Sequence, residues 1–150
     1  MKWIIYTIAA LVIMIGIMLV AYSVASRKLP ELGLLNGQLR PCPATPNCVC
    51  SEYQVESAFV EPLTYTTTAE QAWAKIKQVI SETGGSLIVE DADYLRVVYE
   101  TPLLRYVDDV EFRQDKNLHR IHVRSASRVG KSDMGVNRKR VEKIRITFNK

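Results

Sequence analysis

The chain opens with a continuous apolar run. Residues 3–26 read WIIYTIAALVIMIGIMLVAYSVAS and contain no charged residue. About 20 apolar residues cross the hydrocarbon core of a bilayer, because an α-helix rises about 1.5 Å per residue. A core helix of a soluble domain would carry polar residues on one face, which this run lacks. The pattern therefore predicts a transmembrane anchor over residues 1–28, with Trp3, Tyr6 and Tyr22 suited to the two interfaces.

A cleaved signal peptide is the alternative interpretation of this run. Lys2 supplies a short positive region, and Ser23-Val24-Ala25 are small enough to precede a cleavage site. The run is longer than the roughly 7–15 apolar residues of a usual signal peptide, which favours an uncleaved anchor. The flanking charges leave the orientation open, because Lys2 stands against Arg27 and Lys28 across the span.

Beyond the anchor, we interpret residues 29–40 as a juxtamembrane linker, since Pro30, Gly33 and Gly37 interrupt its leucines. The remaining residues, 41–150, are enough for one ordinary domain.

Within this domain the apolar period is first helical and then alternating. A strand is predicted over residues 57–63, and a helix follows between a Thr67 or Thr68 cap and a stop at Gly84-Gly85. A final helix is predicted over residues 137–148, with Asn137 as its cap. Between the helices, alternation predicts four strands, at residues 86–90, 94–101, 106–113 and 119–125.

The links between these strands are too short for helical crossovers, which predicts an antiparallel sheet. Alternation places one set of side chains on an apolar face: Leu95, Val97, Tyr99, Val110, Phe112, Ile121 and Val123. The other face receives Arg96, Glu100, Asp109, Glu111, His122 and Arg124. A sheet with one apolar face needs cover on that side. The predicted fold class is therefore α+β: a four- or five-stranded antiparallel sheet with two helices packed on one face.

All three cysteines, Cys42, Cys48 and Cys50, lie in one short proline-rich stretch. Cys42 and Cys48 enclose a small loop that is easily cross-linked, and disulfides persist outside the cytosol. A zinc site would need a fourth ligand and a CxxC pair, so no metal is predicted. A Cys42–Cys48 disulfide on the non-cytoplasmic side of the membrane is favoured over free thiols, while a Cys42–Cys50 pairing remains open.

The net charge is +4, and the excess of basic residues falls late in the chain. A Gly-containing turn joins the last predicted strand to the last helix, whose N-terminus offers unpaired N–H groups to an anion. Arginine forks nearby would add bidentate donors. This corner is predicted to bind a small anion or a lipid headgroup through Arg124, Ser125, Ser127, Arg128, Asn137, Arg138 and Arg140.

An internal ion-pair network is the competing interpretation of the same charges. Asp108, Asp109 and Glu111 lie one strand away from Arg120, His122 and Arg124, and opposite charges on neighbouring strands attract. Asp133 is predicted to pair with Arg128 or Arg138.

An enzyme would use the polar sheet face, with Asp109, His122 and Arg124 as its working residues. A triad of His122, Asp109 and Ser125 or Ser127 is disfavoured, because alternation places His122 and Ser125 on opposite faces. The sequence predicts no cofactor. Nucleic acid is disfavoured as a partner, because the basic stretch has no interleaved aromatic residues.

Three sequence blocks carry a resemblance to a known family: RPCPATPNCVCSE, YVDDVEF and VRSASRVGKSDMGVNRKRVE. They resemble the domain-of-unknown-function family 1499 (DUF1499) from about residue 40 to residue 145. The resemblance implies an exported or membrane-attached protein and supplies no reaction. The family pattern has Ser where this chain has Cys50, which supports the Cys42–Cys48 pair. The sequence thus predicts a membrane-anchored, non-enzymatic binding domain and leaves its oligomeric state undetermined.

Overall fold

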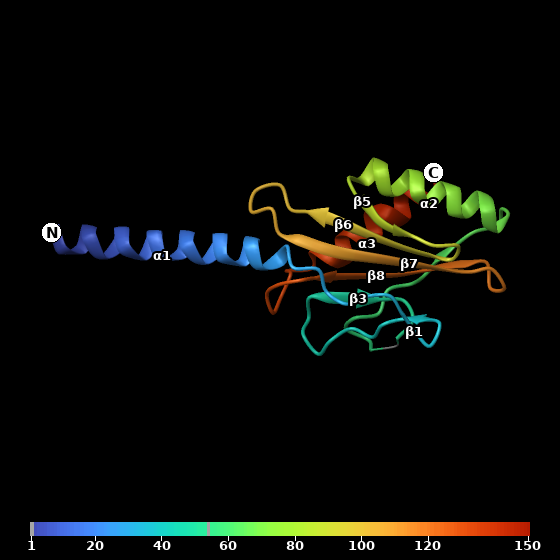
Figure 1. The fold of residues 1–150 in the computed structure, drawn as a ribbon, viewed down its shortest axis with the longest axis horizontal. Helices are drawn as coiled ribbons and strands as arrows, with labels where there is room; N and C mark the ends of the chain where they lie inside the picture. Colours follow the sequence, from blue (N-terminus) through green and yellow to red (C-terminus); the bar gives the residue numbers. More distant parts are fainter. Residues whose placement is uncertain (1, 54) are drawn as a thin grey trace.

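The computed structural model describes residues 2–53 and 55–150. The apolar run forms one helix, α1 (Lys2–Ser26), that projects from one end of the domain (Figure 1). Its side chains are largely exposed up to Ser26, which is fully buried against the domain. A helix this long and apolar is able to cross a membrane, and a signal sequence near the N-terminus would share these properties.

A six-stranded antiparallel sheet forms the centre of the domain. Its order is β3-β8-β7-β6-β5, and β4 pairs with the free part of β8 beside β3. The predicted α+β class is confirmed, with more strands than expected because two short strands share the β8 edge. The strands are β3 (Cys48–Cys50), β4 (Leu63–Thr64), β5 (Ser86–Glu90), β6 (Tyr94–Glu100), β7 (Val107–Asp115) and β8 (Arg120–Ser127).

The strand predicted over residues 57–63 is wrong. This segment forms a turn and an isolated bridge at Phe59, and only Leu63 belongs to β4. Two of its carbonyl oxygens, on Ser57 and Phe59, accept hydrogen bonds from the guanidinium of Arg138. Pro62 has no N–H to donate to a ladder. The carbonyls of the segment are therefore used by a side chain of a later helix.

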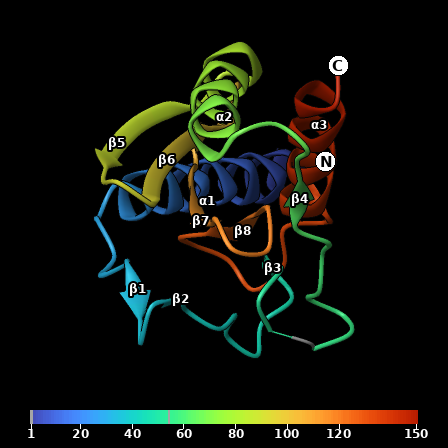
Figure 2. The same cartoon turned by 90° about the vertical axis from the view of Figure 1, so that its right-hand side faces the viewer.

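Two helices, α2 (Ala69–Thr83) and α3 (Val136–Phe148), cover the apolar face of the sheet (Figure 2). Thr68 caps α2 in a capping box with Gln71, and Gly84 ends it in the left-handed conformation (φ 91°). The predicted face assignment is confirmed, since most of the apolar set is completely buried under the helices. These residues are Leu95, Val97, Val110, Phe112, Ile121 and Val123, with Tyr99 slightly exposed.

The opposite, polar face of the sheet is also covered. A small hairpin of β1 (Leu34–Leu35) and β2 (Gln38–Leu39) lies on the side away from α2 and α3 (Figure 1). Leu39 is fully buried and forms a second cluster with Cys50 and Tyr94. Residues 29–40, predicted as a juxtamembrane linker, thus pack in part on the sheet.

Candidate functional site

Buried carboxylates on the polar face of the sheet are each paired with arginine. Asp109 is 2% exposed and accepts hydrogen bonds from two guanidiniums, one from a neighbouring strand and one beyond β8. Arg96 Nη2 lies 3.1 Å from its Oδ1, and Arg128 Nε lies 2.6 Å from its Oδ2. Arg128 also donates to the backbone oxygen of Ser26 at 3.1 Å, so the same side chain joins this cluster to the end of α1.

Glu111 is the most deeply buried acid of the domain, with no exposed surface. Its Oε2 accepts from Arg124 Nη1 at 2.9 Å, and its Oε1 accepts from the Tyr94 hydroxyl at 2.8 Å and from the Gly33 N–H at 3.1 Å. Burial and the Glu111 carboxylate together raise the pKa of Tyr94 far above its usual range. The Tyr94 hydroxyl is therefore a permanent donor to Glu111.

A third buried carboxylate, which sequence analysis missed, is that of Glu52. Its Oε1 lies 2.5 Å from Arg113 Nη2, and its Oε2 accepts the Leu39 N–H at 2.6 Å. His122 Nε2 is 4.0 Å from this carboxylate, and the Ser51 hydroxyl is 3.2 Å from His122 Nδ1. Burial lowers the pKa of His122, with Glu52 acting in the opposite sense. Nothing in the sequence marked Glu52, because the loop that carries it reaches the polar face only in the folded chain.

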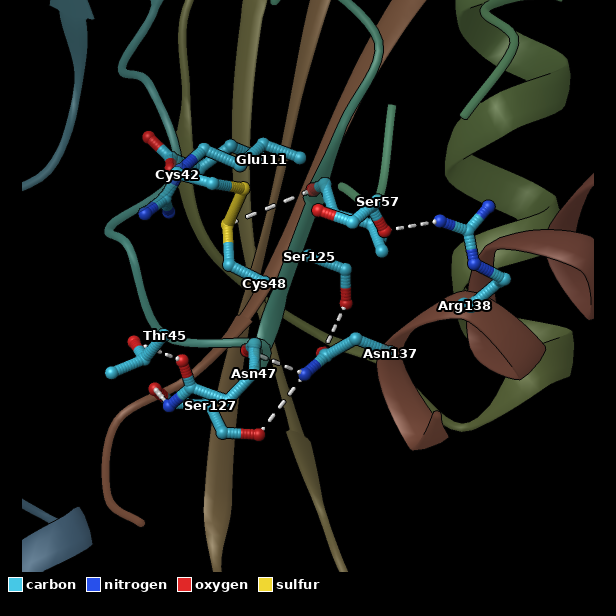
Figure 3. The surroundings of a disulfide bond; sticks show 12 residues. Cys42, Thr45, Asn47, Cys48, Ser57, Glu111, Ser125, Ser127, Asn137 and Arg138 are labelled. Atoms are coloured by element: carbon cyan, nitrogen blue, oxygen red, sulfur yellow. Dashed lines mark hydrogen bonds and ion pairs between the residues drawn. A yellow bond between two sulfur atoms is a disulfide. The ribbon is translucent and has the colours of Figure 1, made fainter. Parts of the chain in front are cut away.

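A separate polar cluster lies on the helix side of the sheet. Asn137, fully buried, accepts from Ser125 Oγ at 2.6 Å and donates to Ser127 Oγ and to the Asn47 carbonyl at 3.0 Å each (Figure 3). Arg140 donates to Asn137 Oδ1 at 2.6 Å and pairs with Asp108 at 2.5 Å. This cluster fastens the first turns of α3 to β7, β8 and the cysteine loop.

The N-terminus of α3 is occupied by a side chain of the protein itself. Asp133 accepts the N–H of Gly135 at 3.0 Å and that of Asn137 at 2.7 Å. Gly135 stands at the N-cap, so the prediction of Asn137 as cap is wrong, as is the predicted ion pair of Asp133 with Arg128 or Arg138. A carboxylate beside these N–H groups is favoured by the helix dipole. The place where an external anion was expected therefore already holds one.

The structure divides the predicted anion-binding residues between two faces. Arg124 and Arg128 point to the polar face, where they pair with Glu111 and Asp109. The others lie on the helix side, where each contacts protein acceptors or donors: Ser125, Ser127, Asn137, Arg138 and Arg140. They do not form one open corner.

The residues of the enzymatic alternative are likewise engaged with other parts of the protein. Asp109 pairs with Arg96 and Arg128, whereas His122 contacts Ser51 rather than Asp109. Ser125 lies under α3, away from His122. Within residues 2–53 and 55–150, no group of three or more His, Cys, Asp or Glu side chains is placed to hold a metal ion.

The cysteine loop is closed by the predicted disulfide. Cys42 and Cys48 are joined, with their Cα atoms 5.6 Å apart (Figure 3). Cys50 is a free thiol, 1% exposed, and burial raises its pKa. A buried thiol of high pKa is a poor nucleophile, because the thiolate is the reactive form.

Two of the cavities at the edges of the domain lie beside the residues discussed above. One, of about 490 Å³, lies between the β1 end and the β5–β6 turn and is lined by Gly33, Tyr94 and Arg96 among others. The other, of about 370 Å³, lies between α1 and the loop that leads into α3, and its walls are mostly apolar.

Comparison with known proteins assigns the family. The family described as "Protein of unknown function (DUF1499)" matches residues 38–148, and the chain belongs to this family. A curated relative is the thylakoid lumenal 17.9 kDa protein, chloroplastic, of Arabidopsis thaliana. It is 41% identical over 76 residues, which is 47% of this chain and 33% of the relative. The match thus spans about a third of that protein's length. No solved structure matches the chain.

Proposed function

We propose that this chain is a single-pass membrane protein that holds a non-enzymatic α+β domain at the non-cytoplasmic surface of the bilayer, where the domain contacts anionic lipid. The observation that carries the proposal is the junction of α1 with the domain. The apolar helix is largely exposed up to its last residue, and there the Ser26 hydroxyl accepts the Val107 N–H at 3.2 Å while its carbonyl accepts from Arg128. An anchor fixed in this way would hold the domain in one orientation over the membrane.

The disulfide supports the non-cytoplasmic side, because the cytosol keeps thiols reduced. The name of the Arabidopsis relative places that protein in the thylakoid lumen, which is also a non-cytoplasmic compartment.

The anionic-ligand hypothesis needs a different location from the one predicted. The guanidiniums of Arg124, Arg128 and Arg140 are held by buried carboxylates. An external anion could bind one of these arginines only by displacing its carboxylate, so each new ion pair would break an existing buried one. Exposed cations near α1, such as Arg27, Lys28 and Lys131, have no such internal carboxylate partner among the described residues.

Membrane extraction and protease protection test the proposal together. The full chain, expressed in a host with a secretory membrane, is expected to resist extraction at alkaline pH and to keep its N-terminal residues by mass. Protease is expected to degrade the domain only from the non-cytoplasmic side. A processed chain that begins after about residue 25 and is released by alkali would instead make residues 3–26 a signal peptide.

The enzymatic alternative is weaker because its residues are held in internal pairs. The enzymatic alternative would be supported if Asp109→Asn abolished an activity while leaving the free energy of unfolding unchanged. Since Asp109 is buried between two arginines, the expected result is loss of folding stability.

A further inference from the structure

The end of the domain nearest α1 carries two highly exposed apolar side chains. Leu103, in the β6–β7 loop, and Met134, in the β8–α3 loop, are each 89% exposed. Both loops lie at the end of the sheet from which α1 projects (Figure 1). We call loops 101–106 and 128–135 the anchor-proximal rim. Single exposed apolar residues are ordinary on a protein surface, so the position of these two matters more than their exposure.

The rim reaches back along α1 toward the membrane. The apolar cavity of about 370 Å³ is lined by Met18 and Leu19 of α1 together with Val129 and Met134 of the rim. At about 1.5 Å per residue, Met18 lies roughly 12 Å before Ser26 along the helix. Rim residues therefore lie beside a part of α1 well short of its junction with the domain.

The length of α1 limits how far the rim can lie from the hydrocarbon core. Residues 3–22 span about 30 Å, the thickness of a typical hydrocarbon core, which puts Met18 and Leu19 inside it. If the rim stayed in water, only the helix up to about Met18 would remain for the core. That segment spans roughly 24 Å, shorter than the core by about 6 Å. Insertion of the rim removes this mismatch.

The charges of the rim are compatible with the interfacial layer. The carboxylate of Asp133 is satisfied by the N–H groups that begin α3, and Arg105 pairs with Glu100 at 3.0 Å. Lys131 is exposed, and a long cationic side chain extends readily to a headgroup. The rim would thus enter the interface without burying an unpaired acid.

The backbone of the rim also has an unusual feature. Arg105 and Met134 both have a φ of 53°, in the left-handed region that a long side chain rarely adopts. The next residue, Gly135, has a φ of 78°. The Met134 side chain, 89% exposed, makes little contact with the rest of the protein.

We infer that the anchor-proximal rim inserts into the interfacial layer of the bilayer that α1 spans, with Leu103 and Met134 as its apolar contacts. The inference rests on the proposed membrane anchor. The bilayer is then the partner of this face. The domain lies on the membrane surface, and the β7–β8 turn points away from it.

Spin labels on the full chain measure this insertion directly. Leu103→Cys and Met134→Cys are labelled in separate preparations and reconstituted in vesicles of phosphatidylcholine with phosphatidylglycerol. Leu118→Cys is the matched control, because Leu118 is an exposed leucine (58%) in the β7–β8 turn at the far end of the sheet (Figure 1). The parent chain, whose free Cys50 is buried, gives the labelling background.

Labels at 103 and 134 are expected to collide more with oxygen, which concentrates in lipid, than with a water-soluble nickel complex. The label at 118 is expected to show the reverse. If the vesicles retain the chain at alkaline pH but the three labels behave alike, the rim lies in water and the inference is overturned. If alkali releases the chain, the membrane anchor itself has failed.

A paired substitution tests the cause of insertion. With the label at Lys131→Cys, Leu103→Glu plus Met134→Glu is expected to shift the accessibility ratio toward the nickel complex, whereas Leu118→Glu leaves it unchanged. Near-UV circular dichroism in detergent is expected to match the parent, since the two side chains make little contact within the domain. An unchanged ratio in a folded variant would refute the role of the two apolar tips.

Discussion

Replacing Glu111 by alanine is expected to destabilise the domain more than any change of a surface charge. The substitution leaves Arg124, whose side chain is 8% exposed, as a buried cation whose carboxylate partner is gone. It also removes the acceptor of the Tyr94 hydroxyl and of the Gly33 N–H. Breaking a buried ion pair from one side costs about 3–5 kcal/mol. Small domains have a total stability of about 5–15 kcal/mol, so the loss is a large share of it.

The exposed pair between Lys77 and Glu90 provides the matched control. It has a similar N–O distance, 2.8 Å, but its side chains are 38% and 48% exposed. Exposed pairs contribute about 0–1 kcal/mol, so Glu90→Ala is expected to change stability little. Replacing both buried partners, by Glu111→Leu with Arg124→Met, is expected to recover much of the loss, because the uncompensated charge is then gone.

Urea unfolding of the full chain in detergent, followed by near-UV circular dichroism, measures these differences. At a slope of about 1–3 kcal/mol per molar urea, Glu111→Ala is expected to lower the midpoint by roughly 2 M. A loss below about 1 kcal/mol, equal to that of Glu90→Ala, would refute the buried pairing. If Arg124→Ala instead kept the stability of the parent and lost binding to lipid headgroups, Arg124 would be a ligand-binding residue.

Three further changes test single features of the fold. Gly85→Ala is expected to cost about 1–3 kcal/mol by overpacking, because an added Cβ would lie 2.7 Å from the Tyr99 ring. Asp133→Ala is expected to cost about 1 kcal/mol through loss of the acceptor at the start of α3. His122, whose pKa is lowered by burial, binds its proton more weakly in the folded than in the unfolded chain. Stability is therefore expected to fall as pH decreases below about 6.5, and to fall less in His122→Gln.

The same urea assay checks all three. Ser86→Ala, beside Gly85 but exposed, is expected to match the parent, and an equal cost in both would contradict the steric account. Asp133→Asn keeps a hydrogen-bond acceptor, so its stability is expected to lie between that of Asp133→Ala and that of the parent. For His122, the comparison is the change in urea midpoint between pH 7 and pH 6. An identical change in His122→Gln would assign the pH dependence to other groups.

The sequence alone determined the elements whose signals are local. Alternation assigned Val97, Val110 and Val123 to the buried face, since successive side chains of a strand point to opposite sides. Thr68 and Gly84 marked the ends of α2 because caps act on their own backbone neighbourhood. The sequence favoured the disulfide between Cys42 and Cys48 because they enclose a short loop, but only the structure excluded a bond between Cys42 and Cys50.

Tertiary structure decided what the charged residues do. Alternation identified a polar sheet face, but the residues that cover it, Gly33, Leu39 and Glu52, lie 50 or more residues before their partners Glu111 and Arg113 or in a neighbouring loop, outside the alternating strands. Whether an arginine is free or paired depends on such long-range neighbours, as Arg124 and Arg128 show. The segment 57–63 does not form the predicted strand, and the carbonyls of its Ser57 and Phe59 accept hydrogen bonds from Arg138, some 80 residues later in the chain. Backbone preference is a local property, whereas the partner of a long charged side chain is set only when distant segments pack.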